Sequence, residues 1–465
     1  MYIFSAIFGL VQMLLLGCIL FREANKKSPA VFLWATLMVM FGVPHFMTSL
    51  FGDTTYSDGV ICEASLFVIA FSLFYFFTRS NKRMNLVQTD RKNQFFSINT
   101  SVAGSSFETI CYTIFLVSII YYMLSTVNSE GGILNTRWSG SSIALGIESE
   151  YVSFKALAQR LIFTFSGFSL YFYLTNRKFK AAIALLLFSM LFLITRNRVQ
   201  MIPLFVFFIS LYLIKIEKIK LKHFVLGMIA ACVVLYIVYA VRALRWLGTL
   251  SSIITNFSWS YINEMVFSFL SEENGELGLR RVFYFFIDSD NNFEGFNNGC
   301  TLLRMIFVYI PSRWSFGLKP QSFDLYMGQA IGMITGGTTH PTLFGDCFGN
   351  FYWFGIFWGI FWALFVNAID FLIKRQKDDF FKIMIFCLAS YSFVIIGRGS
   401  VSNGFDPTAW GLLMLAIINV LFSGLKKTDI CVTTGRIKFT FSNLINTRIS
   451  FAKSQCKSND SFHTK

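Results

Sequence analysis

Apolar and polar stretches alternate along this chain in runs that match the thickness of a bilayer. A helix needs about 20 apolar residues to cross a membrane, and an open strand edge would leave backbone amides unpaired in lipid. The pattern therefore predicts an all-α, polytopic integral membrane protein with about eleven (ten to twelve) transmembrane helices. We expect them at 2–21, 30–48, 60–78, 107–126, 156–174, 180–195, 199–214, 223–241, 351–373, 381–397 and 408–424.

The polar stretches divide the chain into a membrane domain, residues 1–425, and a basic tail, residues 426–465. Two long segments between spans, 127–154 and 242–350, are predicted to be outer loops, the second forming a large loop in the C-terminal half. Within this second loop, 258–270 and 301–310 are apolar enough to predict short helices.

Lysine and arginine in the short loops predict the orientation. They follow the first, third, fifth, seventh, ninth and last spans, and positive loops stay in the cytoplasm. The N-terminus is therefore expected outside and the C-terminus in the cytoplasm. Much of the net charge of +15 comes from this cytoplasmic set, which membrane orientation and attraction to anionic lipid explain. We therefore predict no nucleic-acid partner.

The two predicted sides carry different cations. Eleven of the 13 basic residues on the outer side are arginine, whereas 19 of the 27 on the inner side are lysine. A guanidinium binds phosphate or carboxylate with two parallel hydrogen bonds, and an ammonium acts as a point charge. The bias favours an anion-binding outer face, although arginines that reach the lipid headgroups or pair with outer acids would give the same count.

Arginines at two turns are the first candidates for that anion. Arg196 and Arg198 occupy the tight turn between the sixth and seventh predicted spans, and Arg398 lies between Gly397 and Gly399. Glycine allows a backbone to approach a ligand closely. A helix-capping role for the first pair and a plain turn around Arg398 are the competing interpretations.

One glycine-rich polar segment offers acid–base chemistry. His340 is the one histidine of four predicted to lie outside in such a setting, and its ring can accept a proton near neutral pH. Asp346 is a candidate either to orient His340 or to act as the base itself. A hydrogen-bonded structural histidine is the alternative. The sequence has no Walker loop, HExxH or GxSxG motif, so we predict neither a metal nor a cofactor.

At these residues the chain resembles the Wzy-type O-antigen polymerases, which join lipid-linked oligosaccharide repeat units. The resemblance covers the span pattern, the large outer loop and the outer arginines, and locally the segments 195–213 and 340–355. Gly345, Asp346, Asn350, Phe351 and Gly355 match the second segment's pattern, and Tyr352 stands where a glycine is often found.

The resemblance implies a metal-independent glycosyltransferase of O-antigen or another surface polysaccharide, working outside the cytoplasm. The growing glycan would leave undecaprenyl pyrophosphate and join a new lipid-linked repeat unit, with a chain-length regulator and a flippase as pathway partners. Arg196, Arg198 and Arg398 would bind the pyrophosphate, with Arg242, Arg245 and Arg313 as second choices, and His340 or Asp346 would be the base. An O-antigen ligase and a lipid-linked oligosaccharide flippase or transporter are the alternatives.

Overall fold

The computed structural model describes a helical protein. The described residues are 2–51, 56–80, 105–129, 154–175, 177–195, 202–215, 258–271, 279–292, 298–310, 314–330, 340–376 and 378–428, with single positions at 233, 236, 237, 240, 243, 244 and 296. Among them no strand occurs, which confirms the all-α prediction. The chain has two compact units, residues 1–417 and 418–465.

Six helical segments of the described residues are long and apolar enough to span a membrane. They correspond to the predicted first, second, third, fourth, ninth and tenth spans, and indicate a multi-pass membrane protein. The full number of spans and the outer loop stay predictions. The six segments are Phe4–Lys26, Ala30–Leu50, Asp58–Thr78, Glu108–Ser125, Thr342–Arg375 and Asp379–Arg398.

The helices of the N-terminal part are α1 (Tyr2–Lys26), α2 (Ala30–Leu37), a π-helical turn (Met38–Gly42), α3 (Val43–Phe51), α4 (Asp58–Thr78) and α5 (Ser105–Ser129). They are followed by α7 (Phe154–Thr164), α8 (Phe168–Leu174), α9 (Lys178–Thr195) and α10 (Ile202–Lys215). The predicted fifth span is thus two helices. Gly167 lies at the break, where an added Cβ would be 3.1 Å from the Met384 sulfur, so a glycine permits close packing there.

The C-terminal part contains α13 (Trp259–Ser271), α14 (Arg280–Asp288), α15 (Cys300–Leu303), α16 (Phe323–Ala330), α17 (Thr342–Phe351) and a 3-10 helix (Tyr352–Phe357). These precede α18 (Trp358–Arg375), α19 (Asp379–Arg398) and α20 (Val401–Thr428). The helix predicted at 258–270 is present, and the one predicted at 301–310 is only one turn long. Residues 342–350, expected in the outer loop, form a buried helix instead.

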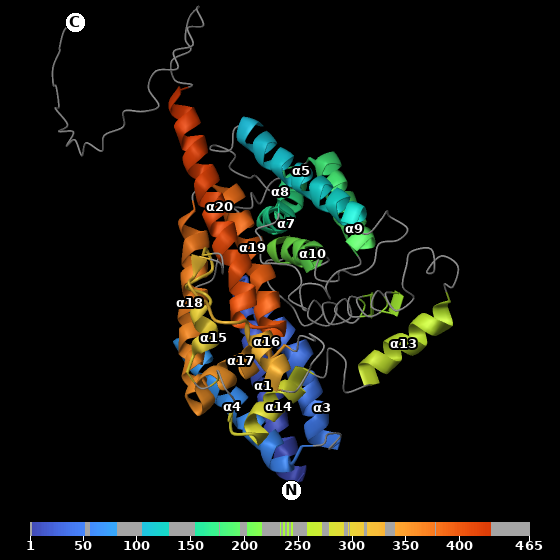
Figure 1. The fold of residues 1–465 in the computed structure, drawn as a ribbon, viewed down its shortest axis with the longest axis vertical. Coiled ribbons are helices and arrows are strands. Elements are labelled where there is room, and N and C mark those ends of the chain that lie inside the picture. Colours follow the sequence, from blue (N-terminus) through green and yellow to red (C-terminus); the bar gives the residue numbers. More distant parts are fainter. Residues whose placement is uncertain are drawn as a thin grey trace, which may run out of the picture. The chain divides into compact units, whose positions relative to one another are not determined.

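Helices from the two ends of the sequence pack together. α4 contacts α1 and α18, and α2 contacts α19 (Figure 1). Gly359 makes the α4–α18 contact possible, because a Cβ there would lie 2.2 Å from the Phe71 carbonyl oxygen. Gly404 has the same role between α20 and α19, where a Cβ would be 2.2 Å from Ile396 Cγ1.

Aromatic contacts fix α14 to the spanning helices. The Phe283 ring centroid lies 5.4 Å from those of both Phe67 and Phe348, and 5.7 Å from that of Phe41. Each such edge-on or tilted pair contributes about 0.5–1.5 kcal/mol beyond its area burial. Next to this cluster, buried His45 hydrogen-bonds the Tyr284 hydroxyl at 2.5 Å. A segment of the predicted large loop is thereby joined to α3 and α4.

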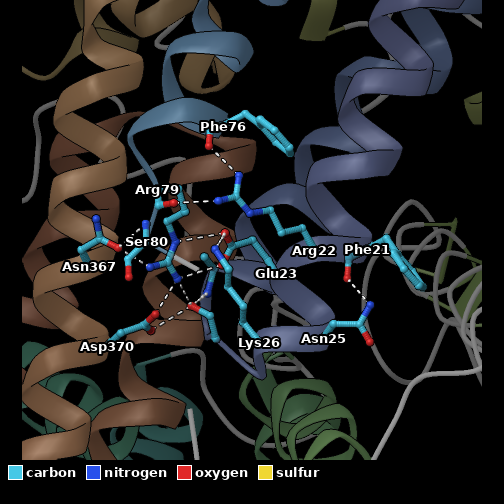
Figure 2. A network of polar contacts seen from close by, with 12 residues as sticks. Phe21, Arg22, Glu23, Asn25, Lys26, Phe76, Arg79, Ser80, Asn367 and Asp370 are labelled. Atoms are coloured by element: carbon cyan, nitrogen blue, oxygen red, sulfur yellow. Dashed lines mark hydrogen bonds and ion pairs between the residues drawn. The ribbon is translucent and has the colours of Figure 1, made fainter. Parts of the chain in front are cut away.

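A buried ionic network joins the C-terminal ends of α1, α4 and α18 (Figure 2). Arg79 donates two hydrogen bonds to the Glu23 carboxylate, at 3.0 and 2.9 Å, and a third to Asp370 at 2.5 Å. Asn367 and Ser28 accept further hydrogen bonds from the same guanidinium, at 2.5 and 3.0 Å. Every nitrogen of Arg79 therefore has an acceptor, and the two buried carboxylates share one strong cation.

Two further cations, Arg22 and Lys26, extend the network. Arg22 donates to the carbonyl oxygens of Phe76 and Arg79, at 2.5 and 2.7 Å, and lies over the Phe76 ring. Lys26 lies 3.5 Å from Glu23. All the cations of this network were predicted on the cytoplasmic side, so these ends share a side as expected. Which side of the membrane they face stays a prediction.

Candidate functional site

Two segments that the sequence singled out separately meet in the structure. They are His340 with the start of α17, and the turn that joins Arg398 at the end of α19 to Val401 at the start of α20. The Val401 backbone N–H donates a 2.7 Å hydrogen bond to Asp346 Oδ2. An added Cβ at Gly399 would lie 3.8 Å from His340 Nδ1, so the imidazole lies beside this turn.

Asp346 links the two segments from a buried position. Its side chain belongs to α17, with 1% of the residue exposed. One carboxylate oxygen accepts from Val401, and the other accepts from Asn350 Nδ2 at 2.8 Å. Since α20 begins at Val401, the carboxylate caps the N-terminus of α20, where the helix dipole favours a negative charge.

Asn350 extends this hydrogen-bond chain toward α15. Its side-chain oxygen accepts from the Thr301 hydroxyl at 2.7 Å, and its backbone carbonyl accepts from the Gly299 N–H at 3.0 Å. Asn291 also reaches α17 and donates to the Phe348 carbonyl at 2.6 Å. The predicted outer loop is thus connected through Asn350 and Asp346 to the turn that carries Arg398.

The local backbone of α17 is strained at both ends. Thr342, two residues after His340, has a φ of +62°, and Tyr352 has a φ of +52°. A β-branched or bulky residue rarely adopts such angles, which cost about 1–3 kcal/mol and occur often at functional sites. The glycine expected at position 352 would adopt this conformation without strain. Tyr352 keeps it while its hydroxyl donates to Asp290 at 3.0 Å.

His340 and Arg398, which the sequence assigned to chemistry, are both half-buried. His340 can act as a proton acceptor, and Arg398, one residue before Gly399, carries a cation; both belong to the region around the capped start of α20.

The other predicted site residues cannot be placed. Arg196, Arg198, Arg242, Arg245 and Arg313 lie outside the described residues. Sequence reasoning missed the roles of Thr301 and Val401, because a hydrogen bond from a hydroxyl or a backbone N–H has no sequence pattern. It also treated Arg79 as an orientation signal only. Asp370 inside a predicted span was the available sign that Arg79 has a buried partner.

The chain matches no protein-family model, no curated protein and no solved structure. The resemblance to the O-antigen polymerases therefore stays a prediction, and the site is interpreted from its own residues.

Proposed function

We propose that this protein polymerises lipid-linked oligosaccharide repeat units at the outer face of a bacterial inner membrane. The observation that supports this most is the meeting of His340 with the Arg398–Val401 turn, held by the hydrogen bond from Val401 to Asp346. A proton acceptor and a guanidinium at one place are what transfer of a sugar from a diphosphate requires.

In the proposed reaction, a hydroxyl of the incoming lipid-linked unit attacks the anomeric carbon of the growing glycan. The new C–O bond forms as the bond from that carbon to the undecaprenyl pyrophosphate oxygen breaks. His340 takes the hydroxyl proton, and the diphosphate leaves with the electron pair of the broken bond. Because the donor is already activated, the protein mainly orients the two substrates and stabilises charge.

We assign charge stabilisation to Arg398, whose planar fork fits a phosphate bidentately. Arg196 and Arg198 are candidates for the same diphosphate, and Arg242, Arg245 and Arg313 are second choices. Several guanidinium groups would be needed, since a diphosphate leaving group carries more than one negative charge.

Asp346 has a different part in the proposal. Its carboxylate accepts hydrogen bonds within the chain and the residue is 1% exposed, so a substrate hydroxyl can reach it less readily than it can reach half-buried His340. We therefore assign the base to His340 and make Asp346 a positioning residue that holds the Gly399–Val401 turn against α17.

The test is reconstitution of the purified full-length protein in proteoliposomes with an undecaprenyl diphosphate-linked oligosaccharide. The expected product is a ladder of lipid-linked glycans, and His340→Ala is expected to slow its formation by about 10²–10⁴-fold, the usual contribution of a general base. His463→Ala, in the predicted cytoplasmic tail, is the matched control and should leave the rate unchanged.

Other outcomes would contradict the proposal. Transfer of the glycan only to a separate lipid acceptor, with no ladder, would indicate a ligase. Movement of the intact lipid-linked unit across the vesicle without a new glycosidic bond would indicate a flippase. In cells lacking the protein, a final acceptor that carries one repeat unit fits a lost polymerase, and one that carries none does not.

A further inference from the structure

A tight turn between α15 and α16 exposes three large apolar side chains. Trp314, Phe316 and Leu318 are 70%, 93% and 69% exposed. Ser315 is buried, and its carbonyl oxygen accepts a hydrogen bond from the Leu318 N–H at 2.8 Å. An added Cβ at Gly317 would meet nothing within 4 Å. The turn therefore forms an apolar tip, residues 314–318, that the described part of the chain leaves uncovered.

The backbone holds the tip in this conformation. Phe316 has a φ of +50° and Gly317 a φ of +78°. Glycine adopts such an angle readily, whereas a bulky residue rarely does, and strain of this kind is often kept at functional sites. At the base of the tip, Lys319 Nζ donates to the Ile310 carbonyl at 3.1 Å. The exposed side chains are thus carried by a fixed loop.

The segment before the tip is attached to α20. The Tyr309 hydroxyl donates to the Ala409 carbonyl at 2.8 Å, and Trp410 Nε1 donates to the Val308 carbonyl at 3.2 Å. The Tyr309 and Trp410 rings meet edge to face with centroids 5.4 Å apart. The sequence predicts a membrane span from residue 408 onward, so the attachment lies at the predicted start of that span. Tryptophan and tyrosine are enriched at such membrane–water boundaries.

The face of α20 that carries Trp410 exposes apolar side chains further along the helix. Leu413 is 36% exposed and Ile417 is 44% exposed. Positions three and seven residues after Trp410 lie on the same side of a helix as Trp410 itself. The loop is therefore attached next to a helix face that is suited to contact with lipid.

We propose that the tip docks on the surface of the bilayer, with Trp314, Phe316 and Leu318 inserted among the headgroups and the upper acyl chains. The tip belongs to none of the six candidate spans, and α15 is only one turn long, so the loop enters the interface without crossing it. Only side chains are inserted, because irregular backbone is not tolerated in contact with hydrocarbon. The contact uses ordinary membrane phospholipid and needs no substrate of the proposed reaction.

A second copy of the protein is the competing occupant of the tip. Tryptophan and phenylalanine each bury about 150–250 Å². Three side chains of this size offer less than the roughly 800 Å² that each partner contributes to a stable protein interface. A bilayer requires no matched surface of that size, and the six candidate spans place lipid next to the chain. The area of the tip therefore favours lipid.

The docked tip would also set the distance between the candidate functional site and the lipid. Thr301 of α15, which precedes the tip, donates its hydroxyl to Asn350 at 2.7 Å. Asn350 donates in turn to Asp346 at 2.8 Å. A contact with lipid at residues 314–318 is thus connected to the helix that carries Asp346.

The experiment measures quenching of Trp314 fluorescence in the full-length protein, reconstituted in phosphatidylcholine vesicles. The Trp314 signal is the difference between the emission of the wild-type protein and that of Trp314→Phe. We expect strong quenching by phospholipid brominated near the headgroup, weaker quenching by phospholipid brominated near the chain end, and protection from iodide in the water. Trp362→Phe gives the control signal, because Trp362 is 2% exposed and should respond far less to the bromine near the headgroup.

A double variant tests whether the apolar side chains cause the insertion. Phe316→Ser with Leu318→Ser should lower the quenching of Trp314 by headgroup-side bromine several-fold and admit iodide, because the tip loses most of its apolar surface. Phe179→Ser removes a 79% exposed phenylalanine at the start of α9 and should leave the Trp314 signal unchanged. All three replaced side chains are exposed, so we expect unchanged midpoint temperatures.

Three results would overturn the proposal. Quenching by iodide without quenching by brominated lipid would place the tip in water. Protection from both quenchers, varying with the ratio of protein to lipid, would place the tip against a second copy. Stronger quenching from bromine near the chain end would mean that the segment lies within the hydrocarbon region instead of at its surface.

Discussion

The two polar regions of the protein use arginine in opposite ways. Around Arg79, every guanidinium nitrogen has a partner within the chain, and 3% of the residue is exposed. Arg398 is half-buried at the end of α19, beside the turn that His340 approaches at Gly399, and the hydrogen bond from Val401 to Asp346 holds the backbone of this turn. The first region is closed, and the second keeps its charged groups partly open.

This difference shows that the presence of a guanidinium fork does not identify a ligand site. On the predicted outer side, arginine was expected to bind an anion with two parallel hydrogen bonds. The structure has this geometry on the predicted inner side instead, where Arg79 donates two hydrogen bonds to Glu23. Two buried carboxylates and an exposure of only 3% at Arg79 make that network structural. A site for a substrate needs a cation that a ligand can reach, and half-buried Arg398 is the candidate for that role.

The largest effect is expected from disrupting the buried Arg79 network. Arg79→Met leaves Glu23 and Asp370 buried without their shared cation, and breaking a buried ion pair in this way costs about 3–5 kcal/mol. We expect a large fall in the midpoint temperature measured by fluorescence-detected size-exclusion chromatography. Arg375→Ala, at the exposed end of the same α18, is the control and should leave the midpoint unchanged. Equal midpoints for both variants would mean that the network does not support the fold.

The next effect concerns the link between α17 and the start of α20. Asp346→Ala removes two hydrogen bonds to a buried carboxylate and the cap of α20, and is expected to cost about 2–3 kcal/mol. Asp346→Asn keeps an oxygen that can accept from Val401, so it should retain most of the stability and of the polymerisation rate. Loss of the rate in a stable Asp346→Asn protein would show instead that this carboxylate is the base.

A smaller effect separates charge from geometry at the open arginine. Arg398→Lys keeps the positive charge but loses the planar fork, and we expect polymerisation to slow about tenfold with an unchanged midpoint temperature. Rates are compared per folded protein in the same vesicles. An unchanged polymerisation rate in this variant would show that residue 398 does not bind the diphosphate bidentately.

The sequence predicted the helical class and six helices that are long and apolar enough to span a membrane, because apolar length is a property of a single stretch of chain. It also selected His340, Asp346 and Arg398, whose residue types and glycine neighbours form local signals. Their meeting was not predictable, because the hydrogen bond from Val401 to Asp346 joins positions 55 residues apart.

Other features depended on contacts that no local pattern contains. Residues 342–350 looked like a polar loop. Asp346 and Asn350 hydrogen-bond each other and also Val401 and Thr301 of two neighbouring segments, so a helix that contains them can be buried. The predicted fifth span is two helices, and Gly167 between them lies close to Met384 of α19, a contact with no sequence pattern. The Arg79 network requires ends of α1, α4 and α18 that are distant in sequence.

We propose that His340 performs chemistry in the half-buried region near Arg398, while the fold depends on the buried Arg79 network. The most direct measurement is the rate of glycan-ladder formation per folded molecule for His340→Ala in vesicles, with the midpoint temperature taken from the same sample. The account predicts a rate lowered by about 10²–10⁴-fold and an unchanged midpoint. A ladder formed at the normal rate by the folded variant would contradict it.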